Sequence, residues 1–313
     1  MTGLLDALVD DAGLFPPTSL DMPSAVRRHR ADLAAAEPML AHRFLCPAAR
    51  IGEFLAELAP EDRVRIILIG GPDPAQTREA IRTVIDAPAL TLAGIEWALA
   101  PLAPSASDAD RPDATSGAEP MATALDVALR ALAEGGAGPD VILFAEPADV
   151  TKAAALTAAL AARRESAGRP LGLKLRCGGV LPELFPPAAD LAAALVAAAS
   201  AGIPVKATAG LHHAVRHTDP ATGFTHFGYL NVLLASAQAV RGRSADEVAS
   251  VLLDTDAGRL ADLARSLTPE EVRRVRSGFA SYGSCSTSVP VREAAELGLS
   301  GRAASPAGGR SPR

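Results

Sequence analysis

The chain has 313 residues, of which 49% are hydrophobic and 21% charged, and its net charge at pH 7 is −6. This apolar fraction suffices for a buried core and excludes a disordered or fibrous chain. The negative charge has the wrong sign for a protein that neutralises phosphates, so we expect no nucleic-acid partner.

The cysteine content and the apolar runs indicate where the protein resides. Its three cysteines, Cys46, Cys177 and Cys285, are too few for a secreted disulfide framework. Acidic residues stand near the N-terminus where a signal peptide would carry basic ones, and the longest apolar run, 191–199, is too short to span a bilayer. We expect a cytoplasmic protein without a membrane partner, and the sequence leaves a homo-oligomer open.

The first part of the chain alternates β-rich and helical runs. Residues 1–36 are predicted to be an N-terminal extension that contains one helix, 24–36, and packs on the domain that follows. Residues 103–120, rich in Pro, Ser, Asp and Ala, are predicted to be a disordered insertion in a βα loop. Strands are predicted at 39–46, 63–69 and 90–99.

The alternation continues to the end of the chain. An eighth strand is expected between 242 and 278, with 251–253 as a short candidate, although Ser244 and Glu247 have the spacing of a helix capping box. The tail, 301–313, is predicted to be disordered. Four further strands are predicted at 140–146, 171–177, 203–208 and 279–284.

Strands that alternate with helices at this spacing pair in parallel through crossover helices. We therefore predict an α/β protein with a single (β/α)8 TIM-type barrel at 37–300, because eight such steps fit this length. In such barrels the reacting groups gather at the C-terminal ends of the strands.

Lysine is rare in this chain, and its positions are informative. Of 30 basic residues only Lys152, Lys174 and Lys206 are lysines, which suggests that a lysine kept inside a strand is needed as an amine. Alternation along 171–177 places Lys174 and Arg176 on the face opposite the leucines, and Lys206 falls on the same face of the next strand. The sequence predicts that both amines point into the barrel.

Neighbouring cations favour nucleophilic chemistry, because a lysine beside another cation loses its proton more readily. Our leading hypothesis is an aldolase-like lyase that needs no cofactor and acts on a small anionic carbonyl compound. Lys206 is predicted to be the Schiff-base nucleophile, and Lys174 to lower its pKa. Arg176, with the turn at Gly178 and Gly179, is predicted to bind the substrate anion.

Proton transfer is assigned to groups near the same strand ends. Glu146 and either His212 or His213 are predicted to move protons, while Glu96 lies in phase to pair with the lysines or contact the substrate. Further candidates for substrate contacts are Thr208, Asn231 and Ser284.

Two alternatives remain open. A metal-dependent lyase or hydrolase would bind zinc, manganese or iron through His212, His213 and His226, with Glu146, Asp11 or a cysteine completing the ligands. A non-catalytic barrel would use its interior cations only to bind an anion, or would neutralise them in a structural network with carboxylates.

Four features carry a resemblance. Lys174-Leu-Arg-Cys-Gly-Gly179, Lys206-Ala-Thr-Ala-Gly-Leu-His-His213, the helix start with His226 and Asn231, and Tyr282-Gly-Ser-Cys285 together resemble a family of uncharacterised bacterial (β/α)-barrel proteins. This resemblance covers most of the chain outside the predicted insertion and tail, and it implies a fold but no activity. The paired lysines on consecutive strands are loosely similar to class I aldolases of the deoxyribose-phosphate type, from which the chain departs in its His-His loop and N-terminal extension.

Overall fold

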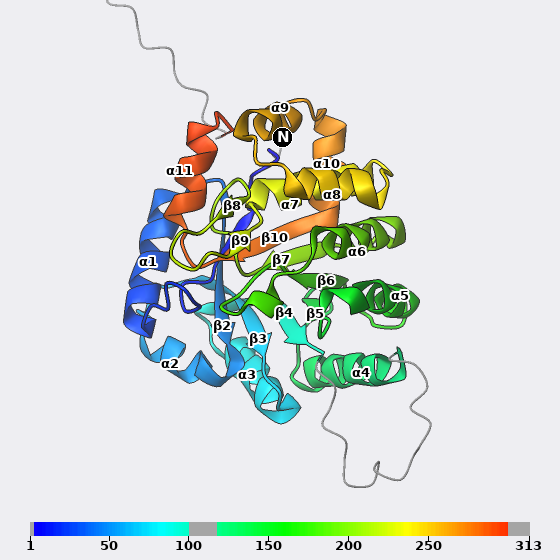
Figure 1. Ribbon diagram of the computed structural model, residues 1–313. Helices are drawn as coiled ribbons and strands as arrows, with labels where there is room; N and C mark the ends of the chain where they lie inside the picture. The colour runs from blue at the N-terminus through cyan, green and yellow to red at the C-terminus, as the bar shows by residue number, and fades with distance from the viewer. Residues whose placement is uncertain (1–2, 100–117, 300–313) are drawn as a thin grey trace, which may run out of the picture.

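Eight parallel strands close into a barrel, as the computed structural model of residues 3–99 and 118–299 shows (Figure 1). Around the barrel the strand order is β1-β10-β7-β6-β5-β4-β3-β2. The predicted (β/α)8 class is thereby confirmed. The barrel strands are β1 (Val9–Asp11), β2 (Leu40–Pro47), β3 (Val64–Gly70), β4 (Leu90–Ala98), β5 (Ile142–Glu146), β6 (Leu171–Arg176), β7 (Val205–Thr208) and β10 (Phe279–Ser284).

Helices surround the barrel, and a small hairpin of β8 (His217–Thr218) and β9 (Thr225–His226) lies in the loop after β7. The α-helices are α1 (Met22–Ala35), α2 (Ile51–Ala56), α3 (Pro74–Asp86), α4 (Ala118–Glu134), α5 (Ala153–Arg163), α6 (Ala188–Ala201), α7 (Tyr229–Val240), α8 (Ala245–Leu253), α9 (Ala257–Arg265), α10 (Pro269–Gly278) and α11 (Ser288–Glu296). Three short 3₁₀ helices are Ala48–Arg50, Val150–Lys152 and Pro182–Leu184.

The eighth strand is not where the sequence pattern predicts it. The candidate at 251–253 is the end of α8, because Ser244 and Glu247 do form the capping box that starts this helix. The missing strand is β1, which pairs with β10 on one side and β2 on the other. Residues 1–36 therefore do not form an extension that packs on a complete barrel: they supply its first strand and its first helix.

Two predictions of disorder fall largely on segments that the structure does not describe. The tail 301–313 and residues 103–117 of the predicted insertion lie outside the described ranges. Residues 118–120, the last three of that insertion, begin α4.

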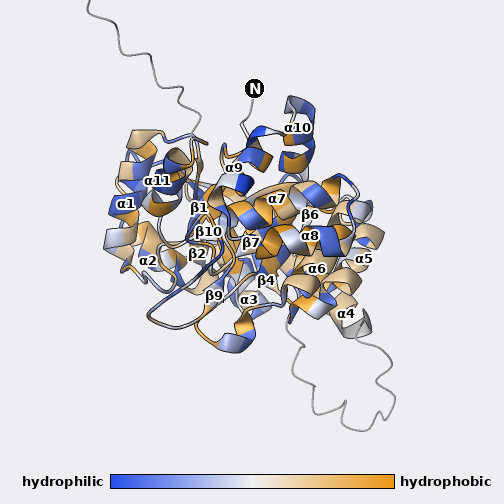
Figure 2. Ribbon diagram, turned by 45° about the horizontal axis from the view of Figure 1, so that its top comes forward, coloured by the Kyte–Doolittle hydropathy of each residue, from blue (hydrophilic) through white to orange (hydrophobic). Residues whose placement is uncertain are grey.

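Apolar packing between the strands and the helices forms the main core. Leu171, Leu173 and Leu175 of β6 are all buried in it, as their alternation predicts. Hydrophobic residues dominate α7, while α10 carries many hydrophilic ones (Figure 2). The segment 182–201 is long and apolar enough to cross a membrane by length and composition, but its helix α6 packs against α5, α7 and α8 in the barrel wall.

Candidate active site

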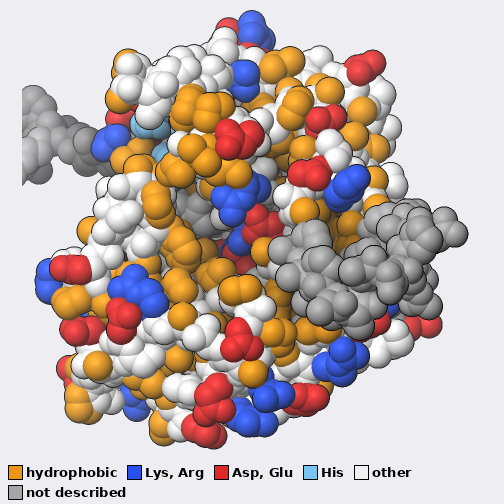
Figure 3. All heavy atoms as spheres, turned by 60° about the horizontal axis from the view of Figure 1, so that its bottom comes forward, with side chains coloured by type: hydrophobic (Ala, Val, Ile, Leu, Met, Phe, Trp, Pro, Cys, Tyr) orange, Lys and Arg blue, Asp and Glu red, His pale blue; other side chains and the backbone are white. Residues whose placement is uncertain are grey.

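A cavity of about 750 Å³ opens at the C-terminal ends of the barrel strands. In Figure 3, charged side chains lie inside a hollow on one face of the molecule, and hydrophobic side chains border it. Lys174, Arg176, Glu96 and Glu146 line the cavity. This is the end of the barrel where the sequence predicts the site.

The two interior lysines stand side by side, as predicted. Lys174 of β6 and Lys206 of β7 are register partners, with 6% and 0% of their surfaces exposed. Their ammonium groups share one carboxylate: Glu96 on β4 lies 2.7 Å from the Lys174 Nζ and 2.9 Å from the Lys206 Nζ. Lys174 also contacts Glu146 at 2.9 Å, so each carboxylate contact offsets part of the cost of burying the amine.

The carboxylates control the protonation of the site. Burial by itself would lower the pKa of Lys174, but Glu96 and Glu146 outweigh burial and hold that pKa above its ordinary value. Burial would likewise raise the pKa of Glu96, but the two ammonium groups hold it below its ordinary value. At Lys174, therefore, the contacts with carboxylates favour the charged form of the amine.

Asp10 is a member of the site that the sequence analysis did not assign. It lies fully buried on β1 and forms an ion pair with Lys206, while Arg43 Nε and Ser281 Oγ each donate a hydrogen bond of 2.6 Å to its carboxylate. Burial acts to raise the pKa of Asp10, and the cations of Arg43 and Lys206 outweigh it and lower the pKa. Barrel closure, which sets β1 beside β10, is what brings Asp10 to Lys206.

These groups form one continuous ion-pair network, which we call the charge network. Its carboxylates are Asp10, Glu96 and Glu146, and its cations are Arg43, Lys174, Lys206 and Arg176. Four cations face three carboxylates, so the network carries one excess positive charge.

Access to the cavity separates the two lysines. Lys174 lines the cavity, whereas Lys206 is fully buried and is not part of the lining. Lys206 lies with its Nζ 5.9 Å from the Phe144 ring centre. Gly172 leaves room for that ring, because a Cβ there would lie 2.5 Å from it. A ligand that enters the cavity therefore meets Lys174 first, whereas the sequence analysis assigned the nucleophile to Lys206.

Arg176 lines the cavity at its rim. Its Nε donates a 3.0 Å hydrogen bond to Glu146, and 44% of its side chain is exposed. Gly179 and Thr208 also line the cavity. Gly178 does not, and serves close packing instead: a Cβ there would lie 3.3 Å from the Gly210 Cα.

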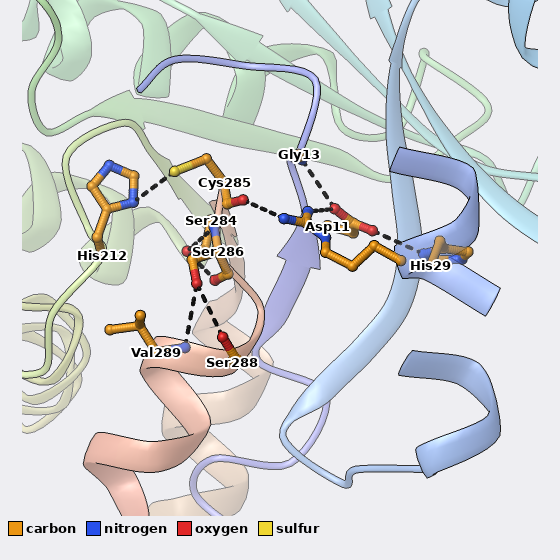
Figure 4. Close-up of polar contacts among 10 residues, drawn as sticks. Asp11, Gly13, His29, His212, Ser284, Cys285, Ser286, Ser288 and Val289 are labelled. Carbon is orange, nitrogen blue, oxygen red and sulfur yellow. Dashed lines mark hydrogen bonds and ion pairs between the residues drawn. The ribbon is translucent and has the colours of Figure 1, made fainter. Parts of the chain in front are cut away.

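His212 lines the cavity and lies next to a thiol. Its Nδ1 is 3.4 Å from the Sγ of Cys285, in the loop after β10 (Figure 4). Burial lowers the pKa of His212 to about 4, with smaller contributions from the three neighbouring histidines. The imidazole is therefore neutral at pH 7 and can accept a proton.

The three other histidines of the loop after β7, His213, His217 and His226, also line the cavity. His213 contacts Glu293 of α11 through its Nδ1 at 2.6 Å, and the His217 ring stacks on His226 with centres 5.3 Å apart. Across residues 3–99 and 118–299, no three His, Cys, Asp or Glu side chains are grouped so that they could hold a metal ion. The proposed ligand set of His212, His213 and His226 thus has no geometric support here, and the metal-dependent alternative stays a prediction.

Besides Gly178, two predicted substrate contacts lie outside the cavity lining. Asn231 is fully buried: its Oδ1 accepts a hydrogen bond from Arg216 N, and its Nδ2 donates to the carbonyls of Val251 and Asp254. Ser284 is also fully buried, and its hydroxyl donates to the Ser286 carbonyl at 2.6 Å. Both residues shape loops around the cavity.

One arginine joins the two strand ends at the closure of the barrel. Arg28 of α1 pairs with Asp11 at the end of β1 and donates a 2.6 Å hydrogen bond to the Cys285 carbonyl. His29 contacts the other oxygen of Asp11 at 3.2 Å. Asp11, a candidate metal ligand by sequence, is thus held in a structural role that fixes the loop carrying Cys285.

Fold and site together define the class: a (β/α)8 barrel with a lysine–carboxylate network on the floor of an open cavity. No protein-family model matches the chain, and no curated protein matches it. The family resemblance that the motifs suggest therefore stays a prediction.

Proposed function

We propose that the protein is an aldolase-like lyase in which Lys174 forms a Schiff base with a small anionic carbonyl substrate. The observation that carries this proposal is the position of Lys174, an amine that lines the cavity and contacts two carboxylates at once. We assign Lys206 to a supporting role, in which it holds Glu96 and Asp10 in place from below.

Proton transfer within the charge network supplies the first step. The Lys174 ammonium passes a proton to Glu146, whose carboxylate lies 2.9 Å away, and the freed lone pair attacks the carbonyl carbon. The carboxylic acid returns the proton to the carbinolamine oxygen, which leaves as water. The resulting iminium is the electron sink for the next step.

Carbon–carbon cleavage then follows from the iminium. A base removes the proton of a hydroxyl two carbons away, the C–C bond breaks, and its electron pair passes to the iminium to give an enamine and an aldehyde. Glu146 and the neutral His212 both line the cavity and can serve as this base. Protonation of the enamine and hydrolysis by water release the second product and restore the amine.

Anion recognition falls to Arg176. Its Nε holds Glu146, and its exposed guanidinium at the rim leaves nitrogens for a substrate carboxylate or phosphate. This contact would orient the carbonyl toward Lys174.

Borohydride trapping tests the proposal. Incubation with a panel of oxo acids and sugar phosphates, followed by reduction and peptide mass spectrometry, should place the adduct on Lys174. Lys174→Met should abolish the adduct, while Lys152→Met, a matched change at an exposed lysine, should leave it intact. Absence of any adduct, or an adduct that survives Lys174→Met, would refute the mechanism.

A non-catalytic anion-binding barrel is the second candidate, and one observation favours it. Each interior ammonium already contacts two carboxylates, an arrangement that a purely structural network would also adopt. Tight anion binding without a trapped adduct, together with unchanged binding in Glu146→Gln, would favour this candidate.

A further inference from the structure

The barrel interior is divided into a charged half and an apolar half. The charged half is built mainly from β4 to β7, which carry most of the charge network. On the opposite side, Ala12, Leu45 and Ile67 form a hydrophobic cluster separate from the main core, and Phe15 and Ile69 pack against it. Because Ala12, Leu45, Phe15 and Ile69 also line the cavity, its wall over β1 to β3 is apolar.

The cavity is larger than a three-carbon oxo acid requires. Pockets that hold ligands of drug size measure about 300 to 1,000 Å³, and this cavity, at about 750 Å³, falls within that range. Its apolar lining also reaches the rim, where Val180 is 65% exposed in the loop after β6. An apolar wall left in contact with water is energetically unfavourable unless a ligand covers it.

Charge indicates which anion the other half accepts. Four cations face three carboxylates in the charge network, and Asp219 adds a further carboxylate to the cavity lining, so this balance suits a monoanion such as a carboxylate better than a phosphate dianion. Arg176 presents a planar guanidinium at the rim, which suits the two oxygens of a carboxylate.

We propose that the substrate is a 4-hydroxy-2-oxo acid, whose hydroxyl permits the C–C cleavage, and that it carries an aryl or branched alkyl group. This inference rests on the proposed function: the carbonyl carbon meets Lys174, the carboxylate meets Arg176, and the apolar group covers Phe15, Leu45 and Ile69. Specificity then comes from the apolar half of the cavity, and chemistry from the charged half.

Calorimetric titration with a homologous series tests this inference. Along pyruvate, 2-oxobutanoate and 2-oxopentanoate, Kd should fall by about fourfold for each methylene added, and phenylpyruvate should bind more tightly still. A Kd that does not change with chain length, or a sugar phosphate that binds more tightly than phenylpyruvate, would overturn the inference.

A variant locates the apolar contact. Phe15→Ala should weaken phenylpyruvate binding about tenfold and leave pyruvate binding unchanged, while Leu253→Ala, a change at an exposed site, should alter neither. The wild-type series remains decisive if Phe15→Ala does not fold.

Binding of acids that lack the ketone distinguishes a failure of this inference from a failure of the proposed function. Propanoate and 3-phenylpropanoate have no ketone and cannot form a Schiff base. Tighter binding of 3-phenylpropanoate supports the apolar site even if no oxo acid can be trapped by borohydride. Trapped pyruvate together with equal binding of the two saturated acids would instead refute the inference and leave the Schiff base standing.

Discussion

Glu96→Gln is the most informative perturbation of the charge network, because this carboxylate contacts both interior ammonium groups. The change keeps the shape of the side chain but removes one buried negative charge, so the excess positive charge of the network rises from one to two. Removal of one partner from a buried ion pair costs about 3–5 kcal/mol. Because Lys174 keeps its contact with Glu146 and Lys206 keeps its contact with Asp10, we expect the free energy of unfolding to fall by about 3 kcal/mol. This is a large part of a typical total stability of about 5–15 kcal/mol.

The loss of stability in Glu96→Gln should become smaller as the pH falls. The folded-state pKa of Glu96 lies below its ordinary value of 4.5, so its stabilising contribution is complete above pH 4.5 and disappears as the pH falls through the lowered pKa. The difference in the free energy of unfolding between wild type and Glu96→Gln should therefore be largest at pH 7 and decrease in acid. Urea unfolding followed by circular dichroism at pH 7 and at lower pH measures this gap.

A surface glutamate supplies the matched control. Glu53 makes the same kind of ion pair, with Arg50 at 2.7 Å, but 55% of its side chain is exposed. Glu53→Gln should leave the unfolding midpoint unchanged, because exposed pairs contribute little. If Glu96→Gln unfolds at the same urea concentration as wild type at pH 7, the two ammonium groups do not depend on Glu96 and the reasoning fails.

Three other predictions concern the cavity and its loops. Iodoacetamide should label Cys285, which lines the cavity, before Cys46 and Cys177, because burial raises the pKa of both of those thiols to about 12. Peptide mass spectrometry that finds Cys46 or Cys177 labelled first would contradict this prediction. Gly228→Ala should lower the thermal midpoint, because its Cβ would lie 2.1 Å from the Ala214 carbonyl oxygen, whereas Gly52→Ala on a helix with open space should not lower it. The rate of Schiff-base trapping should rise with pH from 6 to 9, since the raised pKa of Lys174 keeps it protonated at neutral pH, and a rate that falls over this range would exclude a protonated resting amine.

The placement of the lysines followed from the sequence alone. Alternation along β6 and β7 fixes which side chains face the barrel interior, because successive residues of a strand point to opposite faces. This period is enough to assign Lys174 and Lys206 to the same interior, and in the folded barrel the two residues are register partners. Glu96 and Glu146 could be named as partners for the same reason.

Roles within the site required the tertiary structure. The depth of each side chain in the barrel decides which lysine reaches the cavity, and depth depends on how strands are staggered rather than on their alternation. The sequence could not show that Lys206 lies beneath Glu96, or that the amide of Asn231 is fully occupied by loop backbone.

Asp10 marks the limit of what the sequence by itself determined. Its strand β1 is three residues long, too short for a periodic pattern, and the only local signal for it is the run of Val9, Asp10 and Asp11 between loops. The sequence alone determined which side chains of each longer strand face the barrel interior, and therefore that both lysines point inward. Closure of the barrel, a contact between residues nearly two hundred positions apart, decided which carboxylate neutralises Lys206, because only the folded sheet brings β1 and β7 to either side of β10.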